Sequence, residues 1–129
     1  MQDYHKLIVW QKAHELATRI HIRSGKIPRV TNADAINQMR RAALSISANI
    51  AEGCGRSSNK DFAKFLGISF GSATELEAHL EFAASTNLIS NKELEDRRAE
   101  IIQIRRMLTG LIRAVQSKQK NPKPRTENP

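Results

Sequence analysis

Apolar residues recur with the spacing of amphipathic α-helices in four segments of the chain. The first segment covers roughly residues 4–22, where apolar positions follow one another at steps of four, three and four. Such steps place side chains on one helical face. The face is formed by Val9, Ala13, Leu16 and Ile20. Gly25 and Pro28 break the pattern and predict the end of this helix.

The second segment begins near Thr31 or Asn32 and combines an apolar seam with a polar stripe. Thr31 followed by Asp34 resembles a capping box with a shorter acid. The apolar heptad seam is Ile36, Met39, Ala43, Ile46 and Ile50. The polar stripe is Arg41, Ser45, Asn49 and Glu52. Short polar side chains beside a core predict close helix contact with internal hydrogen bonds.

The third segment begins at Ser58 and carries two seams. The first seam is Phe62, Leu66, Ser69, Ala73, Leu76, Leu80 and Ala83. The second seam is Phe65, Ile68, Ser72, Glu75, His79 and Phe82. Two seams predict neighbours on two sides and the most buried helix of the four. Gly67 and Gly71 each cost about 1 kcal/mol relative to alanine inside a helix, which predicts a close helix approach or a local kink.

The fourth segment opens with a capping box, Ser90 with Glu93, and we expect its helix to reach about Ser117. Its seam is Leu94, Ile101, Ile104, Leu108, Leu111 and Val115. No segment alternates with a two-residue period, so the sequence predicts an all-α, antiparallel up-down four-helix bundle over residues 1–117. Residues 118–129 contain three prolines and no apolar residue, which predicts a disordered, flexible basic tail.

The break at Gly53-Cys54-Gly55 is best interpreted as a glycine helix stop followed by the Ser58 helix cap. A P-loop or a dinucleotide-binding fingerprint would need a preceding strand, which the pattern does not predict. The functional alternative is that Arg56, beside the free amides of the next helix, holds a phosphate.

Catalytic and metal-binding patterns are absent from the sequence. The four histidines have no acid placed to form a relay, and Glu75 and His79 lie four apart instead of in a Glu-x-x-His motif. We therefore expect no metal, no cofactor and no enzymatic activity. Because a buried acid must be partnered, we expect Glu52 and Glu75 to be buried or half-buried and to pair with an arginine, foremost Arg40 or Arg41, or with helix-terminal amides. The expected structural polar network is Arg40, Arg41, Ser45, Asn49, Glu52, Ser72 and Glu75.

The formal net charge of +8 is concentrated at the two ends of the chain. Residues 1–28 carry +3 and residues 91–129 carry +5, whereas residues 57–90 carry −2. An excess of this kind suits an anionic partner such as nucleic acid. The N-terminus lacks the pattern of a signal peptide, and no apolar run approaches the roughly 20 residues that span a bilayer. We therefore expect a cytoplasmic protein with no membrane partner.

A basic stripe on the fourth helix is the main candidate for binding. From 97 to 125 there are nine basic residues and one acid, Glu100. The candidate nucleic-acid-binding residues are Arg98, Arg105, Arg106, Arg113, Lys118 and Lys120, together with Arg56. One interpretation is a solvated helix face, and the other is a surface that contacts phosphates without reading sequence. The six Phe, Trp and Tyr residues sit mostly at core spacings, so we do not expect a base-stacking platform.

Three stretches resemble a known protein family. "LIVWQKAHELA", "RRAALSISANIAEG" and "GSATELEAHL" are similar to the four-helix bundle proteins encoded in 23S ribosomal RNA intervening sequences, over roughly residues 4–115. The resemblance implies an antiparallel bundle that assembles as a homopentamer, with a basic surface suspected of binding nucleic acid and no established catalytic activity. More distantly, the chain resembles accessory proteins of diversity-generating retroelements, which implies a reverse transcriptase as a protein partner. The alternative function is a structural or protein-interaction module that does not bind nucleic acid directly.

Overall fold

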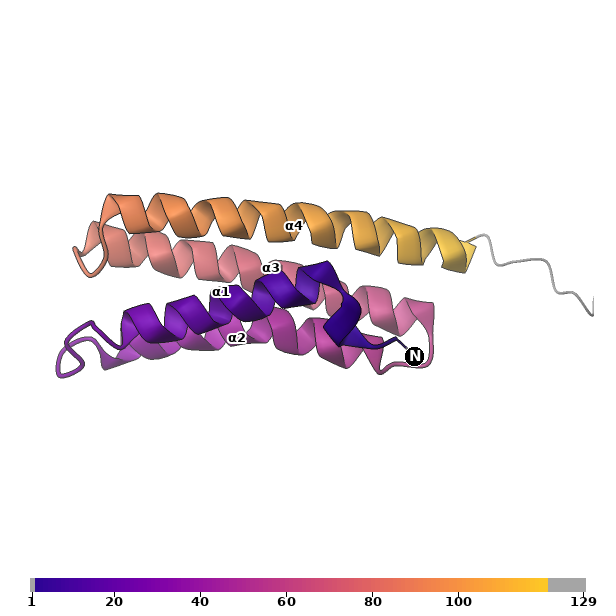
Figure 1. The fold of residues 1–129 in the computed structure, drawn as a ribbon, viewed down its shortest axis with the longest axis horizontal. Coiled ribbons are helices and arrows are strands. Elements are labelled where there is room, and N and C mark those ends of the chain that lie inside the picture. The colour runs from indigo at the N-terminus through magenta and orange to yellow at the C-terminus, as the bar shows by residue number, and fades with distance from the viewer. Residues whose placement is uncertain (1, 121–129) are drawn as a thin grey trace, which may run out of the picture.

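The computed structural model describes residues 2–120, with side chains through Lys118, and folds as four long α-helices (Figure 1). The elements are a 3-10 turn η1 (Tyr4–Lys6) followed by α1 (Ile8–Ser24), α2 (Ala33–Cys54), α3 (Asn59–Ser85) and α4 (Asn91–Lys120). The described residues contain no strand. The predicted all-α, up-down four-helix bundle is confirmed.

Consecutive helices run antiparallel and close into a four-membered ring. α1 packs against α2 and α4, and α3 packs against α2 and α4. The α1–α2 and α3–α4 connections lie at one end of the bundle (Figure 1). The α2–α3 turn, the N-terminal segment and the end of α4 lie together at the other end. No helix of the described residues is both long and apolar enough to cross a membrane.

Each helix contributes one apolar stripe to a shared core. All the seam residues predicted for α1 and α2 are buried, as is every residue of the first seam of α3. On α4, Leu111 alone among the predicted seam residues is only partly buried. Removal of these stripes from water supplies the main driving force for the bundle.

The helix ends follow some of the predicted capping signals. Ser58 and Ser90 act as caps, accepting hydrogen bonds from the backbone amides of Asp61 and Glu93 at 3.1 and 3.0 Å. The predicted start of α2 is wrong in detail. Asn32 is the residue before the helix, and no side-chain hydrogen bond caps the helix. The side-chain amide of Asn32 donates to the carbonyl of Pro28 at 2.7 Å.

The outer helices also differ from their predicted bounds. Leu7 adopts an extended conformation between η1 and α1, so the first helix begins at Ile8 instead of near residue 4. α4 continues through Lys120, past the predicted end at Ser117. The rest of the predicted tail, residues 121–129, lies outside the described residues.

Of the second seam predicted for α3, only Ser72 is buried in the single chain. Ile68 is 43% exposed and Phe82 is 61% exposed, because α3 contacts only α2 and α4. A Cβ atom added to Gly67 or Gly71 would meet nothing within 4 Å. The predicted close approach at these two glycines is therefore wrong for one chain.

The close helix approach is found at Gly53 instead. A Cβ atom there would lie 2.9 Å from Cδ1 of Phe62 and 3.1 Å from Cβ of Phe65. Only glycine lets the last turn of α2 and the first turns of α3 come this close, and this contact sets the position of the α2–α3 turn.

Candidate nucleic-acid interface

The N-terminal half of α4 ties its arginines to acids of the bundle. Arg98 binds Glu77, Glu81 and Glu95 at 3.1, 2.7 and 2.6 Å, respectively. The hydrogen bonds to Glu81 and then Glu77 raise the pKa of the Arg98 guanidinium above its ordinary value. Arg105 binds the second oxygen of Glu77 at 2.8 Å. These two arginines, interpreted from sequence as part of a free phosphate-binding stripe, are engaged in α3–α4 ion pairs.

The C-terminal half of α4 is different, because it carries cations without acids. No acidic residue occurs between 101 and 120. Arg106, Arg113 and Lys118 are exposed and form no ion pair with any residue that the structure describes. Lys120 ends the helix, and its side chain lies outside the described part. Three of the predicted binding residues thus face solvent unpaired along α4.

A cavity of about 290 Å³ opens beside this half of α4. Arg56 and Lys118 both line it, together with Gln2 and the residues 57–59 that start α3. The N-terminal segment is held here because the backbone N–H of Gln2 donates to the backbone carbonyl of Cys54 at 3.2 Å. The first amides of a helix have no intrahelical acceptor and carry a partial positive charge, so the polar wall of this cavity suits an anion.

Arg56 is held in place by weak, exchangeable contacts. It pairs with Glu52 at 2.9 Å, and its guanidinium lies 4.5 Å from the centre of the Phe65 ring. Both partners of the ion pair are about half exposed. Exposed pairs of this kind contribute roughly 0–1 kcal/mol, so a phosphate could replace the carboxylate.

Sequence reasoning missed the contribution of Gln2 and Asn59 to this cavity. The run Ser57-Ser58-Asn59 is a recognisable helix-start signal. No sequence signal indicated that the N-terminal segment and the end of α4 would meet this turn, since that proximity depends on the lengths and directions of four helices.

Part of the predicted polar network forms between α2 and α3. The hydroxyls of Ser45 and Ser72 lie 2.8 Å apart, and the Asn49 amide donates to both the carbonyl and the hydroxyl of Ser45. The apolar seam of α3 adds a bond that the sequence did not indicate. Ser69, fully buried, donates to the Ile46 carbonyl at 2.8 Å, which satisfies its hydroxyl inside the core.

The two acids expected in the network are about half-buried in the single chain, but neither pairs with Arg40 or Arg41. The side chains of Glu52 and Glu75 are 54% and 55% exposed, and they pair with Arg56 and His79, respectively. The predicted partner Arg40 serves another purpose.

Arg40 donates to the Ser24 hydroxyl at 2.8 Å and to the His21 carbonyl at 3.0 Å, so its positive charge caps the C-terminus of α1. Arg41 is exposed and bonds to no described residue. Across the described part of the chain, no group of three or more His, Cys, Asp or Glu side chains is placed to hold a metal ion.

Comparisons with known proteins identify the family. The family model described as "23S rRNA-intervening sequence protein" matches residues 5–110. A search of curated proteins found no significant match. Among solved structures, the chain is similar to a protein of unknown function from the S23 ribosomal protein family of Bacteroides thetaiotaomicron, with 29% identity and a TM-score of 0.74. That match covers 81% of this chain and 98% of the other. The chain therefore belongs to the 23S rRNA-intervening sequence protein family.

Proposed function

We propose that the protein is a non-catalytic, oligomeric helical bundle that binds RNA or DNA through its phosphate backbone. The binding surface consists of Arg106, Arg113 and Lys118 on α4 and of Arg56 in the α2–α3 turn. One observation carries the proposal: the C-terminal half of α4 exposes its cations without a single acid and adjoins the cavity where Arg56 and Lys118 meet. Surfaces that serve only solubility usually intersperse both signs of charge.

Backbone contacts of this kind give affinity without sequence readout. The logarithm of the binding constant falls with the logarithm of salt concentration by about 0.7 per phosphate contact for single strands and about 0.9 for duplex B-DNA. Three or four contacts thus correspond to a slope of roughly −2 to −4.

Binding of a labelled single strand across a salt series tests the proposal. Arg113→Glu should weaken binding and make the slope shallower by roughly one contact. Lys92→Glu is the matched control, because it makes the same charge change at the other end of α4, where Lys92 is 81% exposed and pairs with Asp96. Equal effects of the two variants would reveal a net-charge effect and defeat the proposed surface. Absence of binding by the natural chain at low salt would defeat nucleic-acid association altogether.

We also propose that the bundle forms a closed homo-oligomer. The support is the outer face of α3, where Ile68 and Phe82 remain exposed and Gly67 and Gly71 have open space beside them. Helices with small residues can approach this face closely. The family resemblance implies five copies, and a ring of that size would multiply a weak phosphate-binding surface into a stronger one through avidity. Light scattering at micromolar concentration gives the mass, and a mass of one chain across dilution would contradict the ring.

A second candidate function is a structural or protein-interaction module, for example an accessory subunit of a polymerase such as a reverse transcriptase. The same exposed apolar residues of α3 favour it. It predicts partner binding through α3 and no affinity for strands at low salt, so the salt series separates the two candidates.

A further inference from the structure

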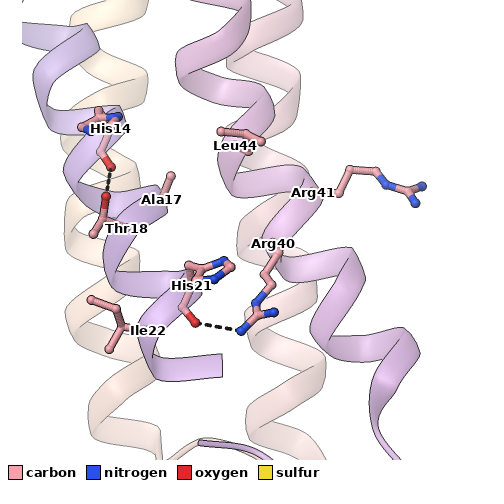
Figure 2. Close-up of a pocket in the computed structure, with 8 residues that line it drawn as sticks. All are labelled: His14, Ala17, Thr18, His21, Ile22, Arg40, Arg41 and Leu44. Carbon is pink, nitrogen blue, oxygen red and sulfur yellow. Dashed lines mark hydrogen bonds between the residues drawn. The ribbon is translucent and has the colours of Figure 1, made fainter. Parts of the chain in front are cut away.

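A second concave site lies between α1 and α2, away from α4. It is a groove of about 590 Å³, which falls within the size range of small-molecule sites. Figure 2 shows one wall formed by residues of α1 and the other by residues of α2. The lining residues are His14, Ala17, Thr18, His21, Ile22, Arg40, Arg41 and Leu44. Ile22 and Leu44 are each 61% exposed, so both walls present apolar surface to solvent.

A stack of rings leads into this groove from the N-terminal segment. The rings of Tyr4 and His5 are stacked at 4.1 Å, and Tyr4 meets Trp10 edge-on at 4.9 Å. Trp10 in turn stacks on His14 at 4.9 Å with only 14° between the planes. Tyr4 and Trp10 also pack against the core, so this cluster lies partly buried beside the groove. His14 ends the series, lines the groove and is exposed.

The charges around the groove favour an anionic occupant. No acidic residue lines it. Arg40 is fixed by its bonds to Ser24 and the His21 carbonyl, as Figure 2 shows in part, and its Nη1 group bonds to no described residue. Arg41 starts at the α2 wall, extends away from α1 in Figure 2, and is likewise unpaired within the described residues. The site therefore combines apolar side chains on both walls with two arginines and no acid.

The groove is short. His14 and His21 lie seven residues apart on α1, which corresponds to about 10 Å along the helix. A docked amphipathic helix would need anchors over several turns, whereas this length suits a single flat ring with its attached phosphate.

We infer that the α1–α2 groove binds one unpaired nucleotide, with the base stacked on His14 and the phosphate at the free Nη1 of Arg40. The inference rests on the proposed nucleic-acid association and adds a base-dependent contact to it. Stacking on an aromatic surface tolerates any base, so the groove would favour unpaired over paired strands without reading sequence.

Trp10, the sole tryptophan, reports on the groove because it stacks on His14. The test compares a short single-stranded adenylate RNA with an abasic strand of the same length and charge. Total binding is measured by fluorescence anisotropy of a labelled strand, and groove occupancy by the change in Trp10 emission. The adenylate strand should bind about tenfold more tightly than the abasic strand and alone should change Trp10 emission.

Two variants with the same charge change locate the effect. Leu44→Glu places a carboxylate in the groove, at a side chain exposed enough to leave the core intact. It should remove the difference between the two strands. Val30→Glu is the control, since Val30 is 98% exposed in the α1–α2 connection and does not line the groove. It should keep the difference. Circular dichroism verifies that both variants remain helical.

The outcomes separate this inference from the proposed function. Equal binding of the two strands with unchanged Trp10 emission overturns the nucleotide groove and leaves the phosphate-binding surface of α4 standing. A response of Trp10 to adenosine monophosphate without any strand binding supports the groove, identifies a free nucleotide as its occupant, and overturns the association with strands. No response to strand or nucleotide overturns both.

Discussion

Replacing Gly53 with alanine tests whether the close approach of α2 and α3 positions the candidate interface. The added Cβ would lie 2.9 Å from Cδ1 of Phe62, 3.1 Å from Cβ of Phe65 and 3.3 Å from the carbonyl oxygen of Phe62. A carbon atom cannot sit this close to a ring and a backbone carbonyl without movement. Because the nearby atoms belong to the first turns of α3, we expect the start of that helix to shift.

The size of the effect follows from two opposing terms. Overpacking a well-packed site typically costs about 1–3 kcal/mol. Alanine recovers up to about 1 kcal/mol of helix propensity relative to glycine, and less in the last turn of α2. We therefore expect Gly53→Ala to lower the free energy of unfolding by about 1–2 kcal/mol.

Gly110→Ala is the matched control, because a Cβ there meets nothing within 4 Å. It lies inside α4, so we expect it to raise the free energy of unfolding by about 0.5–1 kcal/mol. Urea denaturation followed by circular dichroism measures both variants at one protein concentration, since oligomers gain apparent stability with concentration. Strand binding gives a second readout, because movement of Phe65 displaces the ring that supports Arg56. A Gly53→Ala variant as stable as Gly110→Ala would refute the packing argument.

Three further predictions concern other parts of the molecule. The hydrogen bond from Lys92 lowers the pKa of Asp96 below its ordinary value. The ionised Asp96 carboxylate therefore stabilises the folded chain above its unfolded-state pKa, and this contribution is lost as pH falls through its folded-state pKa. An NMR titration of the carboxyl carbon should show the Asp96 midpoint rising towards the ordinary value in Lys92→Met, and an unchanged midpoint would contradict this cause. Burial raises the pKa of the Cys54 thiol and shields the sulfur from solvent. A disulfide reagent should therefore react with Cys54 only as fast as the chain opens. Rapid reaction in native buffer would show that the thiol is accessible. Phe82→Glu should lower the oligomer mass seen by light scattering while preserving helical circular dichroism, because this 61% exposed side chain contributes little to the core of one chain; an unchanged mass would assign assembly to another face.

The apolar periodicity was sufficient to predict the bundle and most of its core. Val9, Ile46 and Leu108 were assigned to inward faces by spacing alone, and all three are buried. Helix starts at Ser58 and Ser90 were also predictable, because a cap depends on side chains within one turn of each other. These features are local, so a single sequence contains the information that determines them.

Features that depend on which helices meet were decided only by the tertiary structure. The second seam of α3 has the same spacing as a core seam, yet Phe82 is exposed because periodicity defines a face and does not say whether a neighbour covers it. The sequence predicts Arg98 as a phosphate-binding residue, but the packing of α3 against α4 brings it to Glu77 and Glu81.

The candidate site likewise combines a feature that the sequence predicts with features that only the tertiary structure decides. The cationic character of α4 is a property of composition and could be read directly from the sequence. The meeting of the α4 residue Lys118 with Arg56 and Gln2 at one cavity depends on the length and direction of every helix. These residues come together only because the α2–α3 turn, the N-terminal segment and the end of α4 reach the same end of the bundle. Likewise, the sequence predicts a helix stop at Gly53 and a close approach or a kink at Gly71, and only the packing of α3 residues against Gly53 makes it the glycine that cannot accept a side chain.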